Sequence, residues 1–169
     1  MLDEAMRTLY AYDRWATARL LDVAAQIPAE QFVAPIGAEQ RSIRDTLVHM
    51  VAAERRWLSW WDGSLPPAEA QRLVLAAHDF PDLPSVRAAW HETDERMQAF
   101  AGPLTDADLA RILTTGGERA GWSAALWKLM LHLATHGTQH RAEIAAMLTT
   151  FGHSPGDLDM TVYYASAGG

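Results

Sequence analysis

Apolar residues recur at every third or fourth position over four long stretches of this chain, which is the spacing of one face of an α-helix. The stretches run from about residue 2 to 27, 42 to 61, 85 to 100 and 122 to 151. Residues typical of helix ends follow them: Pro28, Asp62-Gly63, Gly102-Pro103 and Gly152. Ser42 is the expected N-cap of the second helix, with Asp45 three residues later. No segment shows strand-like alternation, so the pattern predicts helices alone.

The connections between these helices differ in length. Residues 62–84 contain Pro66-Pro67 and leave room for a short helix around 68–77, whereas residues 104–121 read as a loop with one turn near Asp106–Ala110. The residues after Gly152 read as a tail. Four amphipathic helices in 169 residues predict an all-α four-helix bundle with one or two short extra helices, in a single domain over residues 1–169. The long second-to-third connection leaves room for a crossover between the ends of the bundle.

Composition and charge exclude several classes of protein. Hydrophobic residues make up 49% of the chain and there are seven tryptophans, which is typical of a globular protein. The net charge of −7 argues against a protein that neutralises nucleic-acid phosphates. The amino terminus lacks the pattern of a secretory signal, and the longest apolar run, Ala124 to Leu131, is interrupted by Lys128 and too short for a membrane span. We therefore expect a cytoplasmic protein without nucleic-acid or membrane partners.

Cysteine is absent from the chain. This excludes disulfides, thiolate metal sites and a cysteine nucleophile. Any metal ion must be bound by nitrogen and oxygen ligands, and any thiol in a reaction must come from a ligand.

The fourth predicted helix carries three histidines at four-residue intervals, His132, His136 and His140. Two imidazoles at this spacing project from one helix face and can bind one metal ion. The apolar stripe of this helix follows Trp122, Leu126, Leu129, Leu133, His136, His140, Ile144, Met147 and Phe151. His140 falls near the centre of the stripe and His136 close to it, whereas His132 lies on the flank, at about −40° from His136.

Two interpretations of these histidines remain open from the pattern alone. Buried imidazoles are held in the neutral form that binds metal, but a core histidine can equally donate to a backbone carbonyl. His49 lies on the flank of the second helix's stripe, where a side chain can still face a neighbouring helix of a bundle. The tryptophans are expected in the core, and Trp57, Trp60 and Trp61 are also candidates for the wall of a pocket.

Several segments together resemble the DinB-like family of metal-dependent proteins, which includes the bacillithiol and mycothiol S-transferases. The similar segments cover most of the chain, and their order and spacing are more specific than any one of them. They are Tyr12–Leu21, Ser42–His49 followed by Glu54–Leu58, His132–Arg141, and Gly152–Asp159. The resemblance implies a four-helix bundle with one metal ion bound by three histidines.

Transferred to this sequence, the resemblance implies that the metal ligands are His49, His136 and His140. His132 is then a pocket residue or a neighbour of the ligands, although a His132/His136 pair remains an alternative. The chain departs from the family pattern after His140, where it reads Ala142-Glu143 in place of Gly-Gln. Glu143 lies near the histidine face and is a candidate to orient a ligand, to bind the metal or to add negative charge, unless it is simply exposed.

The resemblance favours an enzyme as the functional hypothesis. Three imidazoles leave an open position on zinc, nickel, iron or manganese, and imidazole suits all four ions. The resemblance implies a thiol S-transferase or isomerase that uses bacillithiol, mycothiol or a similar small thiol on a small-molecule substrate, and a homodimer. A metal-dependent hydrolase and a non-catalytic metal-binding stress or sensing domain are the alternatives. No catalytic residue beyond the metal ligands is indicated.

Overall fold

Four long helices dominate the computed structural model, which describes residues 1–37, 41–115 and 121–166. They are α1 (Leu2–Ala24), α3 (Ile43–Trp61), α5 (Leu83–Ala101) and α7 (Leu126–Thr150). The shorter elements are α2 (Ala29–Val33), α4 (Pro67–Ala70), the 3₁₀ turn η1 (Ala77–Asp79), α6 (Asp106–Ala110), α8 (Met160–Ser166) and the strands β1 (Ile112–Thr114) and β2 (Ser123–Ala125). The all-α prediction is confirmed apart from this small hairpin.

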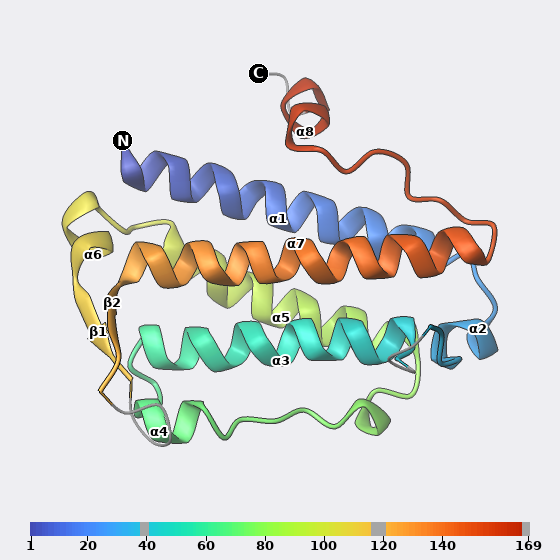
Figure 1. Ribbon diagram of the computed structural model, residues 1–169, viewed down its shortest axis with the longest axis horizontal. Coiled ribbons are helices and arrows are strands. Elements are labelled where there is room, and N and C mark those ends of the chain that lie inside the picture. Colours follow the sequence, from blue (N-terminus) through green and yellow to red (C-terminus); the bar gives the residue numbers. More distant parts are fainter. Residues whose placement is uncertain (38–40, 116–120, 167–169) are drawn as a thin grey trace.

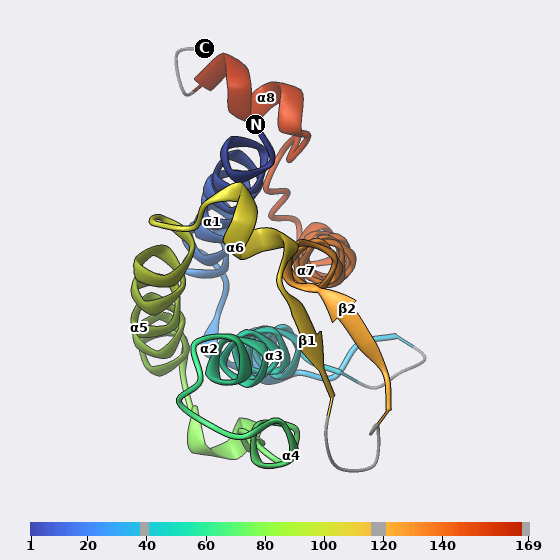
Figure 2. The same cartoon turned by 90° about the vertical axis from the view of Figure 1, so that its left-hand side faces the viewer.

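Each long helix packs against two of the others. Helix α1 contacts α5 and α7, and α3 contacts the same two, so that α1 and α3 lie diagonally opposite when the molecule is seen along its helices (Figure 2). Helices α1 and α7 run in one direction and α3 and α5 in the other (Figure 1). The connection from α3 to α5 therefore returns along the length of the molecule, as a crossover. The arrangement is consistent with the predicted helical bundle.

The ends of α3 are those predicted from the sequence. The backbone N–H of Asp45 donates to Oγ of Ser42 at 3.0 Å, and the N–H of Ser42 donates to the Asp45 carboxylate at 3.3 Å. This reciprocal capping box stabilises a helix start by about 1 kcal/mol. Gly63 follows the helix with φ of 77°, a conformation that side chains disfavour. The two ends set where α3 begins and stops along the chain, and therefore which turn of the helix carries His49.

The start of α5 is displaced from the prediction by two residues. Asp82 is the N-cap, and the N–H of Ser85 donates to its carboxylate at 2.9 Å. Pro84 lies in the first turn of the helix, where its missing N–H costs no hydrogen bond.

The predicted start of the fourth helix at Trp122 is wrong. Residues Ser123–Ala125 form β2, which pairs antiparallel with β1, and the side chain of Trp122 is 50% exposed. The N–H of Thr115 donates to the carbonyl of Trp122 at 2.8 Å, and the N–H of Leu126 donates to the carbonyl of Arg111 at 2.9 Å. Long-range pairing thus satisfies backbone groups that a helix would otherwise pair locally. The expectation of no strands fails for the same reason.

The tail after Gly152 folds back over α1 and contains α8, which the sequence pattern did not predict (Figure 1). The hydroxyl of Tyr12 donates to the carbonyl of Leu158 at 2.9 Å, and Arg19 donates to the carbonyl of Pro155 at 3.1 Å. The ring of Tyr163 packs against Trp15 with a centroid separation of 5.7 Å. A helix this short is held by such contacts rather than by its own hydrogen bonds.

The apolar core is divided into two clusters along the bundle. The first includes Phe32 of α2 together with Leu20, Leu21, Ile43, Met50, Val86, Ile144 and Leu148. The second includes Leu109 of α6 together with Met6, Leu58, Trp61, Met97, Leu126, Leu129 and Leu133. Polar and charged side chains occupy the level between them, including His136 and His140 on α7. The candidate site therefore lies where the apolar core is interrupted.

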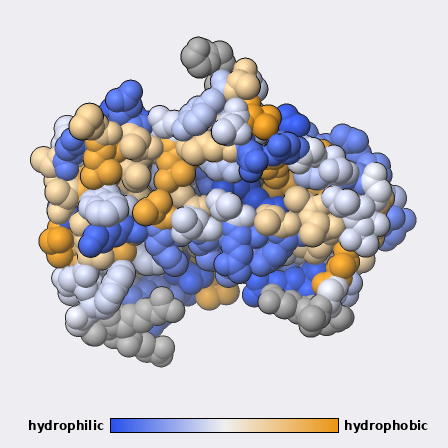
Figure 3. Space-filling model, turned by 45° about the horizontal axis from the view of Figure 1, so that its top comes forward, coloured by the Kyte–Doolittle hydropathy of each residue, from blue (hydrophilic) through white to orange (hydrophobic). Residues whose placement is uncertain are grey.

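The outer surface bears on the predictions about membranes and oligomers. Across the part of the chain that the structure describes, every helix falls short of the length and apolar character that a bilayer crossing requires. On the face seen in Figure 3, hydrophobic residues form several small patches between hydrophilic ones. The homodimer stays a prediction.

Candidate metal centre

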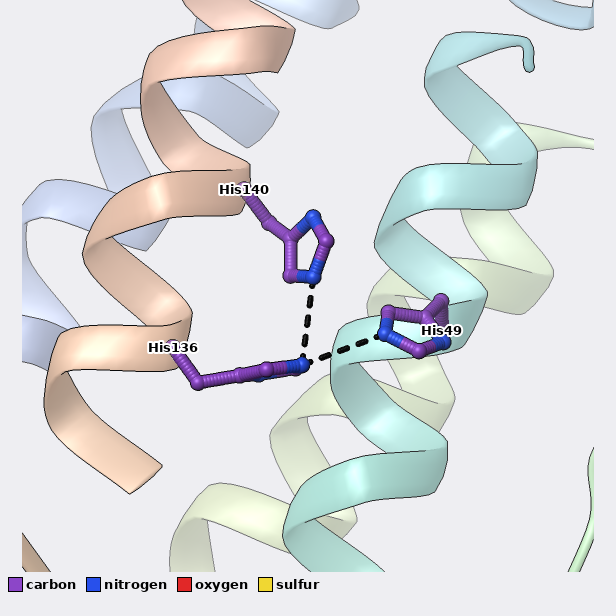
Figure 4. Close-up of side chains that lie close together, drawn as sticks. All are labelled: His49, His136 and His140. Carbon is purple, nitrogen blue, oxygen red and sulfur yellow. Dashed lines mark hydrogen bonds between the residues drawn. The ribbon is translucent and has the colours of Figure 1, made fainter. Parts of the chain in front are cut away.

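Three histidines from two helices point their rings toward one another (Figure 4). Nε2 of His136 lies 3.2 Å from Nε2 of His49 and 3.1 Å from Nε2 of His140. Each of the three residues offers one nitrogen within 4.8 Å of the other two. These are the three histidines that the sequence indicated, and the tertiary structure brings them together.

The spacing of these nitrogens fits a single metal ion. Zinc binds imidazole nitrogen at about 2.0–2.1 Å, so two such ligands in tetrahedral geometry lie about 3.3 Å apart. The two Nε2 separations, 3.2 and 3.1 Å, are close to this value. Three ring nitrogens can hold a divalent ion in this arrangement without a large movement of either helix.

The two helices position the ligands by simple periodicity. His136 and His140 are separated by one turn of α7 and lie on the same face. His49 comes from α3, which packs against α7 with the opposite chain direction. Its place on the flank of the apolar stripe is what turns it toward α7. His140 is 6% exposed, whereas His49 and His136 are intermediate in burial.

Two of the three histidines, His49 and His136, are held in the form that binds metal. Burial, followed by the charges that His140 and His49 carry when protonated, lowers the pKa of His136 to about 4. Burial and then the charge of His140 also lower the pKa of His49, with smaller effects of Arg41 and Arg56. Both rings are therefore neutral near pH 7, and each can offer a lone pair to a metal ion.

Glu143 fixes the orientation of one ligand. Its carboxylate Oε2 lies 2.7 Å from Nδ1 of His140. A carboxylate only accepts hydrogen bonds, so Nδ1 carries the proton and Nε2 presents its lone pair to the site. Burial is the largest single effect on the pKa of Glu143 and raises it, but the hydrogen bonds from His140 and Gln139 and the nearby positive charges together leave the pKa below its ordinary value. Of the roles considered for Glu143, the geometry supports that of orienting a ligand.

Replacing Glu143 by glutamine is expected to weaken zinc binding by about 10-fold, because the amide is a weaker acceptor that no longer adds negative charge behind His140. Competition with a chelating dye measures the affinity. Glu95→Gln, an exposed carboxylate on α5, is the matched control. Equal affinities for Glu143→Gln and the control would show that the contact does not tune the site.

His132 lies outside the group of three. Its side chain is exposed, its ring centre is 6.3 Å from that of His136, and the ring packs edge-on against Trp57 at 5.4 Å. The position agrees with the interpretation of His132 as a pocket residue rather than with a His132/His136 ligand pair.

A large cleft adjoins the histidines, with a volume of about 1240 Å³. His49 and His136 line it on one side and His132 stands in its wall, whereas the described lining does not include His140. Trp57 and Trp60 also line it, which agrees with the expected pocket wall. Trp61 is only 2% exposed and belongs to the core, so that part of the expectation is wrong. A ligand in the cleft has direct access to two of the three histidines.

A second buried cluster of charged residues was missed by the sequence analysis. Each long helix contributes one member at the level between the two apolar clusters: Asp13, Glu54, Asp94 and Arg141. Arg141 forms an ion pair with Asp13, and Arg14 lies 3.1 Å from the Asp94 carboxylate. Each member occupies a helical position that an apolar residue would otherwise fill, as Asp13 does between Tyr10 and Thr17 of α1. The sequence signal for this cluster was a charged residue at a position of the apolar helix face.

Within this cluster, Glu54 holds a proton at neutral pH. Burial, and then the negative charges of Asp13 and Asp94, raise the pKa of Glu54 to about 8, although Arg141 opposes the shift. A cavity of about 10 Å³ beside it, lined also by Tyr10, has room for about one water molecule.

Glu54→Gln is expected to stabilise the protein above neutral pH. The pKa of Glu54 is raised on folding, from 4.5 to about 8, so its contribution to stability is present below pH 4.5 and is lost as the pH rises toward 8. Glutamine cannot titrate and avoids that loss. Since Glu54 as a whole residue is only half-buried, solvent reduces the effect, and we expect a gain of about 2 kcal/mol at pH 8 and little at pH 5.

Urea unfolding at pH 5 and pH 8 measures this difference. The exposed Glu30→Gln serves as the control for loss of a carboxylate. A Glu54→Gln protein that is no more stable than the wild type at pH 8 would contradict the assignment of a protonated side chain.

Comparisons with known proteins agree with the earlier resemblance. The family model described as the DinB family matches residues 1–168 of this chain. Protein DinB of Bacillus subtilis (strain 168) is 24% identical over 161 residues, which cover 92% of this chain and 91% of that protein.

Proposed function

This chain belongs to the DinB family, and on that premise we propose that it is a metal-dependent enzyme that joins the sulfur of a small thiol to a small electrophilic substrate. The thiol is bacillithiol, mycothiol or a molecule of the same kind, and isomerisation through a thiol adduct is the related reaction. The observation that carries the proposal is the group of three converging imidazole nitrogens beside a large cleft. The absence of cysteine adds that the ligand must supply the sulfur.

His49, His136 and His140 would hold one divalent ion of zinc, nickel, iron or manganese through their Nε2 atoms. A bound ion of this type stabilises the thiolate form of a thiol and so lowers its pKa. Three protein ligands are typical of catalytic zinc sites, in which a further position remains for a water molecule or the substrate. Because His49 and His136 line the cleft, a small molecule in the cleft would reach a bound ion from that side.

The remaining roles belong to side chains of the cleft. Trp57 and Trp60 offer apolar walls that exclude water from the substrate. His132 lines the same wall, and we propose that it relays the thiol proton. In the transfer itself, the sulfur electron pair forms the new C–S bond. The electrons of the broken bond depart with the halide, move to the epoxide oxygen, or move to the α-carbon of the activated alkene. The thiol proton goes to solvent, or to the substrate when the electrophile is an epoxide or an activated alkene.

A thiol-transfer assay tests this proposal. Protein freed of metal and protein reloaded with zinc, nickel, iron or manganese are each incubated with a small thiol and an electrophile panel of alkyl halide, epoxide and activated alkene. We expect conjugate, detected by mass spectrometry, only where both thiol and metal are present, and none with His136→Ala.

Three other results would count against it. Equal conjugate formation without metal would contradict the role of the histidines. Cleavage of activated esters with no thiol present would favour a hydrolase. A change of oligomeric state on adding metal, without any turnover, would favour a sensing domain.

A further inference from the structure

The walls of the cleft have a charge opposite to that of the whole chain. Among its described lining residues are three cations, Arg56, Arg72 and Lys128, and no aspartate or glutamate. The complete chain carries a net charge of −7 with 21 acidic side chains. A cleft whose described walls carry cations and no carboxylate favours an anionic ligand and repels a cationic one.

Among these three cations, Arg56 is the one with a buried N–H that lacks a hydrogen-bond partner in the described part of the chain. Its Nε is buried and has no hydrogen-bond partner, and no ion pair is found for its guanidinium among the described residues. By contrast, the neighbouring Arg55 donates to Thr93 and pairs with Glu92 at 2.8 Å. A buried guanidinium N–H without an acceptor is costly, and an incoming ligand that supplies an acceptor removes that cost.

The position of Arg56 relative to the histidines sets the length of such a ligand. Arg56 follows His49 by seven residues on α3, so both lie on nearly the same helix face and about 10 Å apart along the axis. The described cleft residues of α3 and α7 continue from His49 and His136 toward α4 and β2, including Trp60, Leu129 and Lys128. A ligand reaching from the histidines to Arg56 is thus a small molecule rather than a single ion.

The surface between the two ends is apolar and aromatic. Trp57 and Trp60 lie side by side with their ring centres 5.6 Å apart, and Trp122 contributes a third indole to the lining. Aromatic walls between a metal centre and a cation suit a ligand with an apolar or aromatic body.

We propose that this cleft selects carboxylate-bearing substrates with an apolar or aromatic body, and that Arg56 is the residue that binds the carboxylate. The inference deepens the proposed function and names the substrate class of the same site. The planar guanidinium matches the two oxygens of a carboxylate, and a charge-assisted pair of this type is about twice as strong as a neutral one. The carboxylate can belong either to the thiol or to the electrophile, and the two sources are separated by experiment.

The first experiment uses protein freed of metal at pH 8, so that neither the ion nor turnover contributes. Isothermal titration calorimetry compares 4-phenylbutyrate with its neutral amide, which has the same body. We expect the acid to bind about 10-fold more tightly than the amide, with the preference lost in Arg56→Gln and reduced by added salt. Arg87→Gln, an arginine of α5 whose partner is Asp22, should keep the full preference.

Equal binding of acid and amide to the wild type would overturn the inference. A preference that survives Arg56→Gln but is lost in Arg72→Gln or Lys128→Gln would overturn the assignment to Arg56. Arg56→Lys provides a second variant that keeps the charge, and we expect it to retain part of the preference even if Arg56→Gln folds poorly.

The second experiment identifies the source of the carboxylate in metal-loaded protein. The half-saturating concentration in the thiol-transfer assay is compared for 3-mercaptopropionate and its amide, and for an electrophile with and without a carboxylate. If the carboxylate form is preferred only among the thiols or only among the electrophiles, and the preference disappears in Arg56→Gln, the carboxylate belongs to that reactant. Carboxylate binding without any thiol transfer would support this inference and reject the proposed function. Thiol transfer without a carboxylate preference would support the proposed function and reject this inference.

Discussion

Replacing any one of His49, His136 and His140 by alanine is expected to lower zinc affinity by at least about 100-fold. A structural zinc site with four ligands contributes about 10–16 kcal/mol, so one ligand accounts for roughly 3 kcal/mol, which is a factor of about 100. The Nε2 separations of 3.1 and 3.2 Å suit one ion bound by all three nitrogens, so each substitution is expected to remove one of three ligands. Competition against a chelating dye measures the affinities.

Two further histidines provide the controls for this series. His132→Ala tests a histidine of the same cleft, and His91→Ala tests an exposed histidine on α5. Both variants should bind zinc nearly as well as the wild type. Helical circular dichroism should be unchanged in all five variants, because two apolar clusters hold the bundle on either side of the site. A ligand variant that folds and keeps wild-type affinity would remove that histidine from the site.

Replacing Arg141 by methionine is expected to destabilise the protein by about 3–5 kcal/mol, because Asp13 is left buried without its partner. The side chains of Arg141 and Asp13 are 3% and 15% exposed, so little water can replace the lost contact. Arg141 also donates to Oγ1 of Thr138 at 2.9 Å and lies 5.6 Å from the ring of Tyr12. Since the whole stability of a domain is about 5–15 kcal/mol, the loss should be large in urea unfolding at pH 7.

The backbone around this pair supports its importance. A Cβ atom at Gly137 would lie 3.0 Å from Nη1 of Arg141 and 3.2 Å from the Asp13 carboxylate. The glycine next to His136 thus leaves the space in which the pair forms.

Two variants isolate the ion pair from loss of packing. In the double variant Asp13→Asn, Arg141→Met no charge is left unpaired, and we expect it to recover at least half of the lost stability. Arg87→Met breaks the exposed pair with Asp22, which should cost less than about 1 kcal/mol. The interpretation fails if Arg141→Met costs no more than Arg87→Met.

The sequence was informative wherever local chemistry decides the structure. Helix periodicity predicted α1, α3, α5 and α7, and the Ser42 cap set the start of α3 within one residue. Gly152 ends α7 as expected, with the N–H of His153 donating to the carbonyl of Leu148 at 2.9 Å. The position of His140 in the apolar stripe separated it from His132 before any contact was known. Periodicity and caps depend on neighbouring residues alone, so one sequence suffices to read them.

Other features depended on contacts between distant segments, and these the sequence did not reveal. The same residues, Trp122 to Ala125, fit a helical stripe but pair with residues 112–115, because a partner strand satisfies their backbone groups. Charged residues at core positions of four helices did not indicate which of them would form ion pairs, because ion pairing in a bundle depends on how the helices pack together.

The chain by itself thus determined four amphipathic helices, the absence of any thiol, and a pair of histidines on one buried face. Only the tertiary structure brought Nε2 of His49 to 3.2 Å from that of His136, placed the Glu143 carboxylate against His140, and put Arg56 in the same cleft with its Nε unpaired among the described residues. The physical reason is that a helix face is set by local periodicity, whereas the groups that face each other are set by the packing of helices far apart in the chain.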